Sequence, residues 1–283
     1  TYDHANQGAA EYAHQRGLYL ERGARSIPSV EGMKTIAYEI SEQLSDRLPE
    51  RMGGQQTTAW VAPDWYFQSV SGGLGPLGVQ KGFIELFQMG LIDHMPSVAC
   101  IQAEGCSPMV KAWHEKKEKA EPVVSPRTHI ATLATGDPGR TYTLLYQRMN
   151  SAYQTSRDTG NNGHNKPICQ PAGLFESVTD EETFRTMHIL ARLEGISVEP
   201  AAAVAFAGLI KLVRAGMIKS DQVIVVNCTG HTMPIELTIL GTGWSRDISL
   251  PETQAAPDSR DYSQASSEQE GLLAALSRVT ADR

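Results

Sequence analysis

The fold of this chain is decided by the stretch Trp65-Tyr66-Phe67-Gln68-Ser69-Val70-Ser71-Gly72-Gly73-Leu74-Gly75-Pro76-Leu77-Gly78, which leads into residues 79–89. Its aromatic and β-branched start predicts a short buried strand, and the serine and glycine run predicts a tight loop. Phe83, Leu86 and Phe87 then follow at the spacing of one helix face. The stretch therefore predicts a strand, a glycine loop and a helix in that order.

A loop of this kind can bind an anion. Because glycine has no Cβ, the backbone N–H groups of Gly72, Gly73 and Gly75 can approach a phosphate closely. The N-terminus of the helix behind the loop adds about half a positive charge. A tight turn between two packed elements would use the same glycines, so the stretch alone leaves both interpretations open.

The composition argues against several classes of function. Of the 283 residues, 41% are hydrophobic and 20% are charged, as in globular proteins. The net charge of -7 and the lack of a basic block argue against a nucleic-acid partner. The longest apolar run, 201–210, is too short to span a bilayer, and no signal-peptide pattern opens the chain. We therefore expect a cytoplasmic protein with neither a nucleic-acid nor a membrane partner.

The cysteines and histidines do not suggest a metal site. Cys100, Cys106, Cys169 and Cys228 lack the C-x-x-C spacing of a zinc site and are too sparse for a disulfide scaffold. His164 lies in a polar segment without a second ligand at metal spacing. We expect free thiols and no bound metal.

Strand and helix patterns alternate along the chain, which predicts a parallel sheet covered on both faces. We expect strands at 17–20, 65–70, 97–103, 175–178 and 222–227. We expect helices at 3–16, 36–44, 79–89, 107–113, 141–153, 180–194, 199–216 and 270–279. We also expect a turn at Pro28 and Gly32, and exposed connections at 45–62 and 154–171.

One strand candidate ends in polar residues. The run 222–227 is the strongest candidate for a central strand, and Cys228-Thr229-Gly230-His231-Thr232 follows it. In α/β sheets, ligands bind at the C-terminal edge of parallel strands. Thr229 is therefore expected to face a ligand, although it could also cap the strand end.

Several short motifs occur in a fixed order: Pro28–Thr35, Val70–Gly75, Ile101–Pro108, Gly136–Pro138, Val178–Glu182, Leu193–Gly195 with Glu199–Ala203, and Thr229–His231. Together they resemble threonine synthase and its relatives among the fold-type II enzymes that use pyridoxal 5′-phosphate (PLP). The resemblance implies an open, mostly parallel α/β sheet flanked by helices. It implies that residues 1–26 end a smaller domain, 27–245 form the large PLP-binding domain and 246–283 form a peripheral tail.

The resemblance also implies roles for single residues. Ser71, Gly72, Gly73, Leu74 and Gly75 match the loop that binds the PLP phosphate. Thr229 matches the hydroxyl residue that faces the pyridine nitrogen, where a neutral group tempers the electron-accepting character of the ring. Glu31 and Lys34 lie in a motif beside the active site, where they contact the substrate or form a surface ion pair in a packed turn.

The chain departs from the family pattern in one major respect, because the motif of the lysine that holds the cofactor covalently is not found. In the family this motif would precede Thr1, so we expect the C-terminal part of an enzyme that is incomplete at its N-terminus. The catalytic lysine is therefore unassigned. A complementing N-terminal chain or a homodimer would fit this expectation.

The expected substrate is a small amino acid. Ile27, Ala134 and Asp137 replace residues that lie near the substrate phosphate in threonine synthases, and Asp137 would repel a dianion. Arg25 and Arg140 could compensate. We therefore expect a PLP-dependent lyase of the threonine synthase type. The alternatives are β-replacement on O-phosphoserine, as in cysteate synthase, which 23–26 and the glycine loop also resemble, and a non-catalytic protein with the PLP fold.

Overall fold

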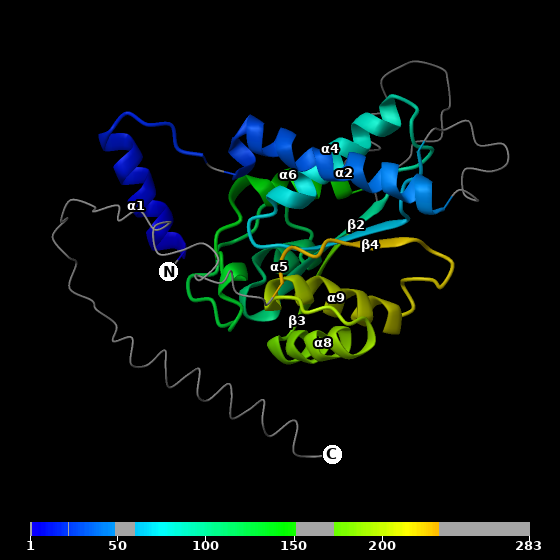
Figure 1. Cartoon of the computed structure of the whole chain (residues 1–283). Coiled ribbons are helices and arrows are strands. Elements are labelled where there is room, and N and C mark those ends of the chain that lie inside the picture. The colour runs from blue at the N-terminus through cyan, green and yellow to red at the C-terminus, as the bar shows by residue number, and fades with distance from the viewer. Residues whose placement is uncertain (1, 22, 49–59, 151–172, 232–283) are drawn as a thin grey trace, which may run out of the picture. The chain divides into compact units, whose positions relative to one another are not determined.

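The computed structural model describes residues 2–21, 23–48, 60–150 and 173–231 (Figure 1). Contacts divide the chain into two units, Thr1–Met233 and Pro234–Arg283, and all of the second unit lies outside the described residues. The predicted insertion 154–171 with His164, Cys169, the tail 246–283 and its helix 270–279 also lie outside them.

The described sheet has four parallel strands in the order β3-β2-β1-β4. The strands are β1 (Trp65–Ser69), β2 (Ser97–Ala103), β3 (Gly173–Val178) and β4 (Ile224–Val226). In register, Phe67 of β1 lies opposite Ala99 on one side and Val226 on the other. The predicted parallel sheet is confirmed, and its carboxyl ends meet at one edge.

The prediction that 222–227 forms a central strand is wrong for the described sheet, in which β4 occupies an end of the order. β4 pairs with β1 at only Ile224, Val225 and Val226, and all three residues are half-buried. A continuous apolar run does not distinguish an inner strand from an outer one, because the place of a strand in the sheet depends on which other strands it pairs with.

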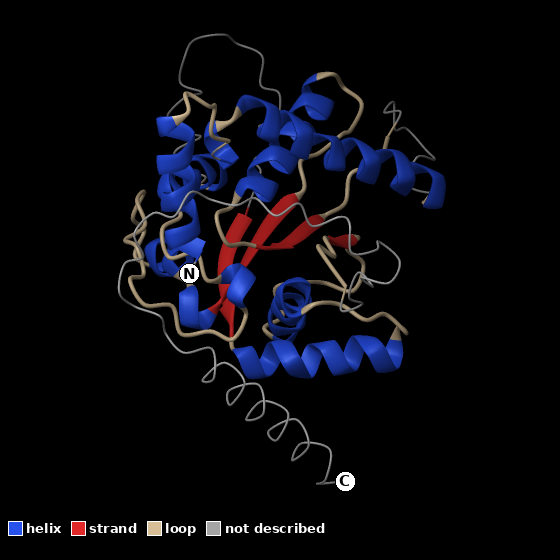
Figure 2. Ribbon diagram, turned by 60° about the vertical axis from the view of Figure 1, so that its left-hand side comes forward, coloured by secondary structure: helices blue, strands red, loops and turns tan. Residues whose placement is uncertain are grey.

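Helices cover both faces of the sheet (Figure 2). Strand residues alternate between two cores, as the pleat requires. Tyr66, Val98 and Cys100 pack with helices α2, α4, α5 and α6, whereas Phe67, Ala99 and Ile101 pack with α9. We call these the α4 face and the α9 face, and α8 packs against α9.

The helices are α1 (Tyr2–Gln15), α2 (Ile27–Arg47), α4 (Leu74–Gln88), α5 (Pro108–His114), α6 (Gly139–Met149), α8 (Asp180–Leu193) and α9 (Pro200–Arg214), with 3-10 turns η1 (Gly23–Arg25), η2 (Glu104–Cys106) and η3 (Ala131–Leu133).

Glycines allow the helices to approach each other and the sheet closely. A Cβ on Gly78 of α4 would lie 2.4 Å from the Cβ of Met33 on α2. A Cβ on Gly208 of α9 would lie 2.6 Å from Ile101 of β2. Such distances are shorter than any real contact, so larger residues would separate these elements.

The predicted start of the second helix is wrong. Residues 36–44 lie inside α2, which begins at Ile27 and contains Pro28 in its first turn and Gly32 in the next. Proline is tolerated there because the first N–H groups of a helix have no intrahelical acceptor. The predicted turn at these residues therefore does not exist.

The predicted strand at 17–20 is also wrong, because this segment closes the end of α1. Gly17 has a φ of +61°, the left-handed conformation that commonly ends helices. Leu18 N–H donates to the carbonyl of Ala13 at 2.8 Å, and Gly17 N–H donates to His14 at 3.3 Å. These bonds complete the helix end and leave no room for strand pairing.

A capping box begins α8, which confirms the helix predicted at 180–194. The Thr179 hydroxyl accepts from the N–H of Glu182 at 3.1 Å, and the Glu182 carboxylate accepts from the N–H of Thr179 at 2.8 Å. The two residues satisfy donors at the helix start that would otherwise be unpaired.

A search of the described helices for one long and apolar enough to cross a membrane finds none. Cys100, Cys106 and Cys228 are free thiols, and the first two are buried.

Two buried glutamines should respond in opposite ways to the same substitution. Gln80 of α4 is fully buried, and neither atom of its amide has a partner among the described residues. Gln102 of β2 is equally buried, but its Oε1 accepts from the N–H groups of Met109 and Val110 at 2.9 and 3.2 Å. We expect Gln80→Met to raise the free energy of unfolding by about 1 kcal/mol and Gln102→Met to lower it by about 1–3 kcal/mol. Urea unfolding of the full-length protein measures both, and equal effects of the two substitutions would contradict the prediction.

Candidate functional site: a cavity at the carboxyl edge of the sheet

The glycine loop joins β1 to α4 as predicted. Val70 N–H still donates to Ile101 of β2 at 2.8 Å, after which the chain turns at residues 71–73. Gly73 is the N-cap of α4, and no side chain caps this helix start. α4 begins at Leu74, earlier than the predicted 79, because the glycines and Pro76 obscure the helical pattern. The first N–H groups of α4 are therefore free of any side-chain cap.

Two of the loop glycines are required by geometry. Gly73 has a φ of +81°, and a Cβ there would lie 3.1 Å from carbon atoms of both Thr141 and Leu145. A Cβ on Gly75 would lie 2.2 Å from Nε2 of Gln68. By contrast, a Cβ on Gly72 would meet nothing within 4 Å.

The loop borders a cavity of about 270 Å³. This volume is slightly below the range usual for small-molecule sites. The lining residues come from the end of β1, the glycine loop, η3, the start of α9 and the segment after β4: Gln68, Ser69, Val70, Ser71, Gly72, Gly73, Leu74, Gly75, Pro76, Thr132, Leu133, Glu199, Ala201 and Thr229. The glycine loop and Thr229, which the sequence analysis nominated separately, thus line one cavity.

Pairing between β4 and β1 brings Thr229 to this cavity. Because the two strands are parallel and in register, their carboxyl ends lie side by side. The N–H of Asn227 extends the pairing by donating to the carbonyl of Phe67 at 2.9 Å. The following segment then packs on the start of α9, where Glu199 N–H donates to Gly230 at 3.1 Å.

The residues present fit a phosphate group and a ring. Ser71 Oγ is buried and has no hydrogen-bond partner among the described residues. A buried hydroxyl is almost always paired, so this atom lacks a partner that a ligand oxygen could supply. The uncapped N-terminus of α4 beside it favours an anion. Thr229 then offers a neutral hydroxyl elsewhere on the same cavity wall.

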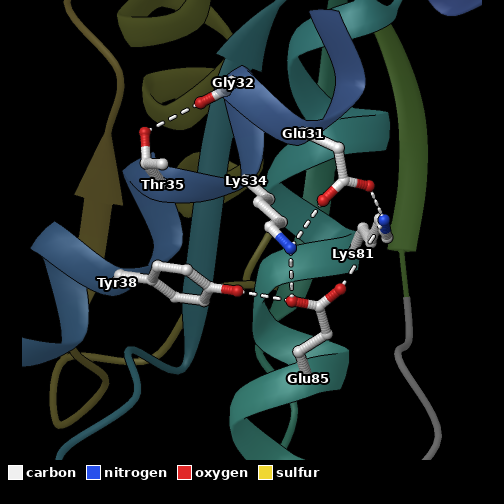
Figure 3. A network of polar contacts seen from close by, with 7 residues as sticks. All are labelled: Glu31, Gly32, Lys34, Thr35, Tyr38, Lys81 and Glu85. Carbon is white, nitrogen blue, oxygen red and sulfur yellow. Dashed lines mark hydrogen bonds and ion pairs between the residues drawn. The ribbon is translucent and has the colours of Figure 1, made fainter. Parts of the chain in front are cut away.

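The substrate candidates Glu31 and Lys34 lie in an ion-pair network between α2 and α4 (Figure 3). Lys34 Nζ lies 2.6 Å from Glu31 and 2.9 Å from Glu85, and Lys81 pairs with both carboxylates. The hydroxyl of Tyr38 donates to Glu85 as well. Neither Glu31 nor Lys34 is among the residues that line the cavity. The surface ion pair is thus present, and contact with a substrate remains a prediction.

The network shifts the charges of its members. The hydrogen bond that Lys34 donates to Glu85 raises the pKa of Lys34 above its ordinary value. Hydrogen bonds from Tyr38 and then Lys34 lower the pKa of Glu85. Both shifts favour the charged forms, so the network stabilises the crossing of α2 and α4 near neutral pH.

Of the other two substrate candidates, Arg140 is not among the residues that line the cavity. Arg25 lies in η1, and its side chain is outside the described part of the structure. Arg140 is exposed near the start of α6. Asp137 accepts from the N–H of Gly139 at 2.8 Å, so its carboxylate contributes to the N-terminus of α6.

Sequence reasoning did not nominate four polar residues of the cavity wall, Gln68, Ser69, Thr132 and Glu199. Gln68 could have been found, because it shares a strand face with Tyr66 and precedes the glycine loop. Glu199 belongs to a motif that the resemblance already marked. Nothing in the local sequence distinguishes Thr132, which reaches the cavity through the position of η3.

Comparison with known proteins identifies the class. Residues 1–230 match the family of pyridoxal-phosphate dependent enzymes, and the chain belongs to this family. PLP is the cofactor of the family.

The relatives that match this chain include threonine synthases and a cysteate synthase. The chain is 31% identical over 231 residues to threonine synthase of Methanocaldococcus jannaschii, which covers 82% of this chain and 48% of that protein. It is 34% identical over 211 residues to threonine synthase of Methanosarcina acetivorans, covering 75% of the chain and 44% of the relative. Cysteate synthase of Methanospirillum hungatei is 29% identical over 216 residues, and the match covers 76% of this chain and 45% of the relative. The chain therefore spans about half the length of the curated relatives it matches.

Solved structures show the same fold. Threonine deaminase isoform 2 from Solanum lycopersicum superposes with a TM-score of 0.58 at 16% identity. The match covers 85% of this chain and 53% of the deaminase chain. A fungal L-serine ammonia-lyase from Rhizomucor miehei superposes with a TM-score of 0.53 at 15% identity, over 79% of this chain and 57% of the lyase chain. The predicted fold-type II α/β architecture is confirmed.

Gly73 should be more sensitive to substitution than a glycine with the same backbone conformation in open space. Gly216 has a φ of +70° and nothing within 4 Å of a Cβ, so Gly216→Ala should cost about 1–2 kcal/mol from the backbone alone. In Gly73→Ala the new methyl group would also press on Thr141 and Leu145, so the free energy of unfolding should fall by about 1 kcal/mol more than in the control. Thermal unfolding of both variants measures the difference. Equal losses would show that the loop surroundings give way freely.

The α2–α4 network should contribute stability that depends on pH. Because the folded-state pKa of Glu85 is lowered, its contribution is present above the unfolded pKa, about 4.3, and disappears as the pH falls through the folded value. We expect Glu85→Gln to lower the melting temperature at pH 7 and the gap from the parent protein to narrow below about pH 4. Glu42→Gln, at an exposed position of α2, serves as the control. A gap that stays constant with pH would contradict the prediction.

Proposed function

We propose that the protein containing this chain is a PLP-dependent lyase of the threonine synthase type. Its substrate would be a small amino acid, often phosphorylated, with a leaving group on the β- or γ-carbon. The observation that carries the proposal is the shared cavity, in which the glycine loop and Thr229 meet. The buried and unpaired Ser71 hydroxyl supports a phosphate at the loop end.

Within this proposal, the loop residues hold the phosphate. The hydroxyl of Ser71 and the backbone N–H groups of Gly72, Gly73, Leu74 and Gly75 donate to its oxygens. The glycines leave these donors without a Cβ beside them. The backbone of the turn would therefore orient the cofactor.

Thr229 would orient the ring of the cofactor. Its neutral hydroxyl would face the pyridine nitrogen without forcing a positive charge on it. When bound, PLP supplies an electron-accepting ring that stabilises negative charge next to the substrate amino group. A neutral partner at the nitrogen moderates this effect, which suits elimination and replacement reactions.

The lysine that holds PLP covalently is proposed to lie outside this chain. No lysine among the described residues lines the cavity. Lys34 and Lys81 are engaged with Glu31 and Glu85, and Lys211 pairs with Glu176 at 3.1 Å. The chain also spans only about half of its curated relatives, which leaves room for a further part of the protein.

A second function is β-replacement on O-phosphoserine. Similarity to cysteate synthase, at 29% identity over 216 residues, supports it. A homodimer and a cytoplasmic location remain predictions under either function.

Product analysis separates the two functions. The full-length protein is incubated with PLP and O-phosphohomoserine, and in parallel with PLP, O-phosphoserine and sulfite, and the amino acids and released phosphate are identified. We expect threonine and phosphate from the first mixture. Cysteate from the second mixture alone would favour the alternative. Absence of product from both would indicate a non-catalytic protein with this fold.

A further inference from the structure

A part-buried chain of hydrogen bonds runs from the end of β4 to β1 and the cavity. The side-chain amide of Asn227, beyond the end of β4, donates from Nδ2 to the hydroxyl of Tyr66 at 2.9 Å. Tyr66 then donates to Oε1 of Gln68 at 2.7 Å. Tyr66 is fully buried, and burial raises the pKa of its hydroxyl, so the group keeps the proton that it donates. The chain ends at Gln68, which lines the cavity.

This chain relates the orientation of the Gln68 amide to that of Asn227. In the structure Nδ2 of Asn227 faces the Tyr66 oxygen and donates to it, so the one proton of the hydroxyl is left for Gln68. Oε1 of Gln68 faces Tyr66 and accepts this proton. If the Gln68 amide alone were reversed, the buried hydroxyl proton of Tyr66 would have no acceptor. Nε2 therefore points away from Tyr66.

The Nε2 group of Gln68 is a free donor beside the phosphate loop. It makes no hydrogen bond to another described residue, in contrast to Oε1. The amide lies across Gly75, in the first turn of α4, where a Cβ would be 2.2 Å from Nε2 and 2.7 Å from Oε1. Nε2 thus adds a donor next to the uncapped N–H groups of α4.

We propose that Gln68 is a binding residue for the cofactor phosphate and that Tyr66 and Asn227 are its positioning residues. Gln68 donates from Nε2 to a phosphate oxygen, and the hydrogen-bond chain holds its amide in the donating orientation. This inference rests on the proposed function, since it assigns one more ligand to the same cavity. It also links the two ends of the site, because Asn227 lies close in sequence to Thr229.

The test uses the full-length protein after removal of its cofactor. The probes are pyridoxamine 5′-phosphate and pyridoxamine, which differ only in the phosphate and cannot react with a lysine amino group. Binding of both is measured by calorimetry for the parent protein and for Gln68→Met, Tyr66→Phe and Gln80→Met. Gln80→Met is the control, because it makes the same substitution at another glutamine on the α4 face, which lies outside the cavity.

We expect Gln68→Met to weaken pyridoxamine 5′-phosphate binding about 10-fold, as for the loss of one hydrogen bond to a charged group. Pyridoxamine binding should stay unchanged, which also shows that the variant is folded. Tyr66→Phe should weaken binding of the phosphorylated probe about 3-fold, because the amide is then free to reverse. Gln80→Met should leave both affinities unchanged.

Two different failures can be told apart. If the parent protein binds both probes equally, the loop does not bind phosphate, and the proposed function and this inference both fall. If the parent protein prefers the phosphorylated probe and Gln68→Met keeps the same preference, only the inference falls. An equal loss of both probes in Gln68→Met would show a structural role for Gln68 and would also overturn it.

Discussion

The pairing of β4 with β1 is the constraint on which the site depends. Because these strands run parallel and in register, the glycine loop after β1 and Thr229 after β4 emerge at the same edge of the sheet. The bond from Asn227 N–H to the carbonyl of Phe67 prolongs this register to the rim of the cavity. Without this pairing, the two groups that define the proposed cofactor site would have no fixed spacing.

The two-sided core supports this arrangement. Tyr66 and Phe67 are neighbours in β1, yet one packs under α4 and the other under α9. β1 is thus clamped from both faces just before its loop begins. Glycines in α4 and α9 bring these helices close to their neighbours, as at Gly78 and Gly208. The loop therefore starts from a strand that has little freedom to move.

Sequence patterns within a few neighbouring residues predicted several strands and helices correctly. The strands 65–70 and 97–103 stand out as apolar runs, and Thr179 and Glu182 form the capping box that their spacing indicates. The start of α2 was missed because Pro28 is favourable in a first helical turn but is a turn signal elsewhere. The glycine loop and Thr229 were found, whereas Gln68, Thr132 and Glu199 were not. Their place on the cavity wall follows from contacts between distant segments, which no local pattern encodes.

The contact between Gln68 and Gly75 has an evolutionary consequence. The side-chain amide of the strand residue occupies the space that any Cβ on the helix residue would need. A larger residue at position 75 would therefore require the Gln68 amide to move. Within the family, we expect the two positions to covary, so that a homologue with alanine or serine after the loop carries a shorter side chain on the strand.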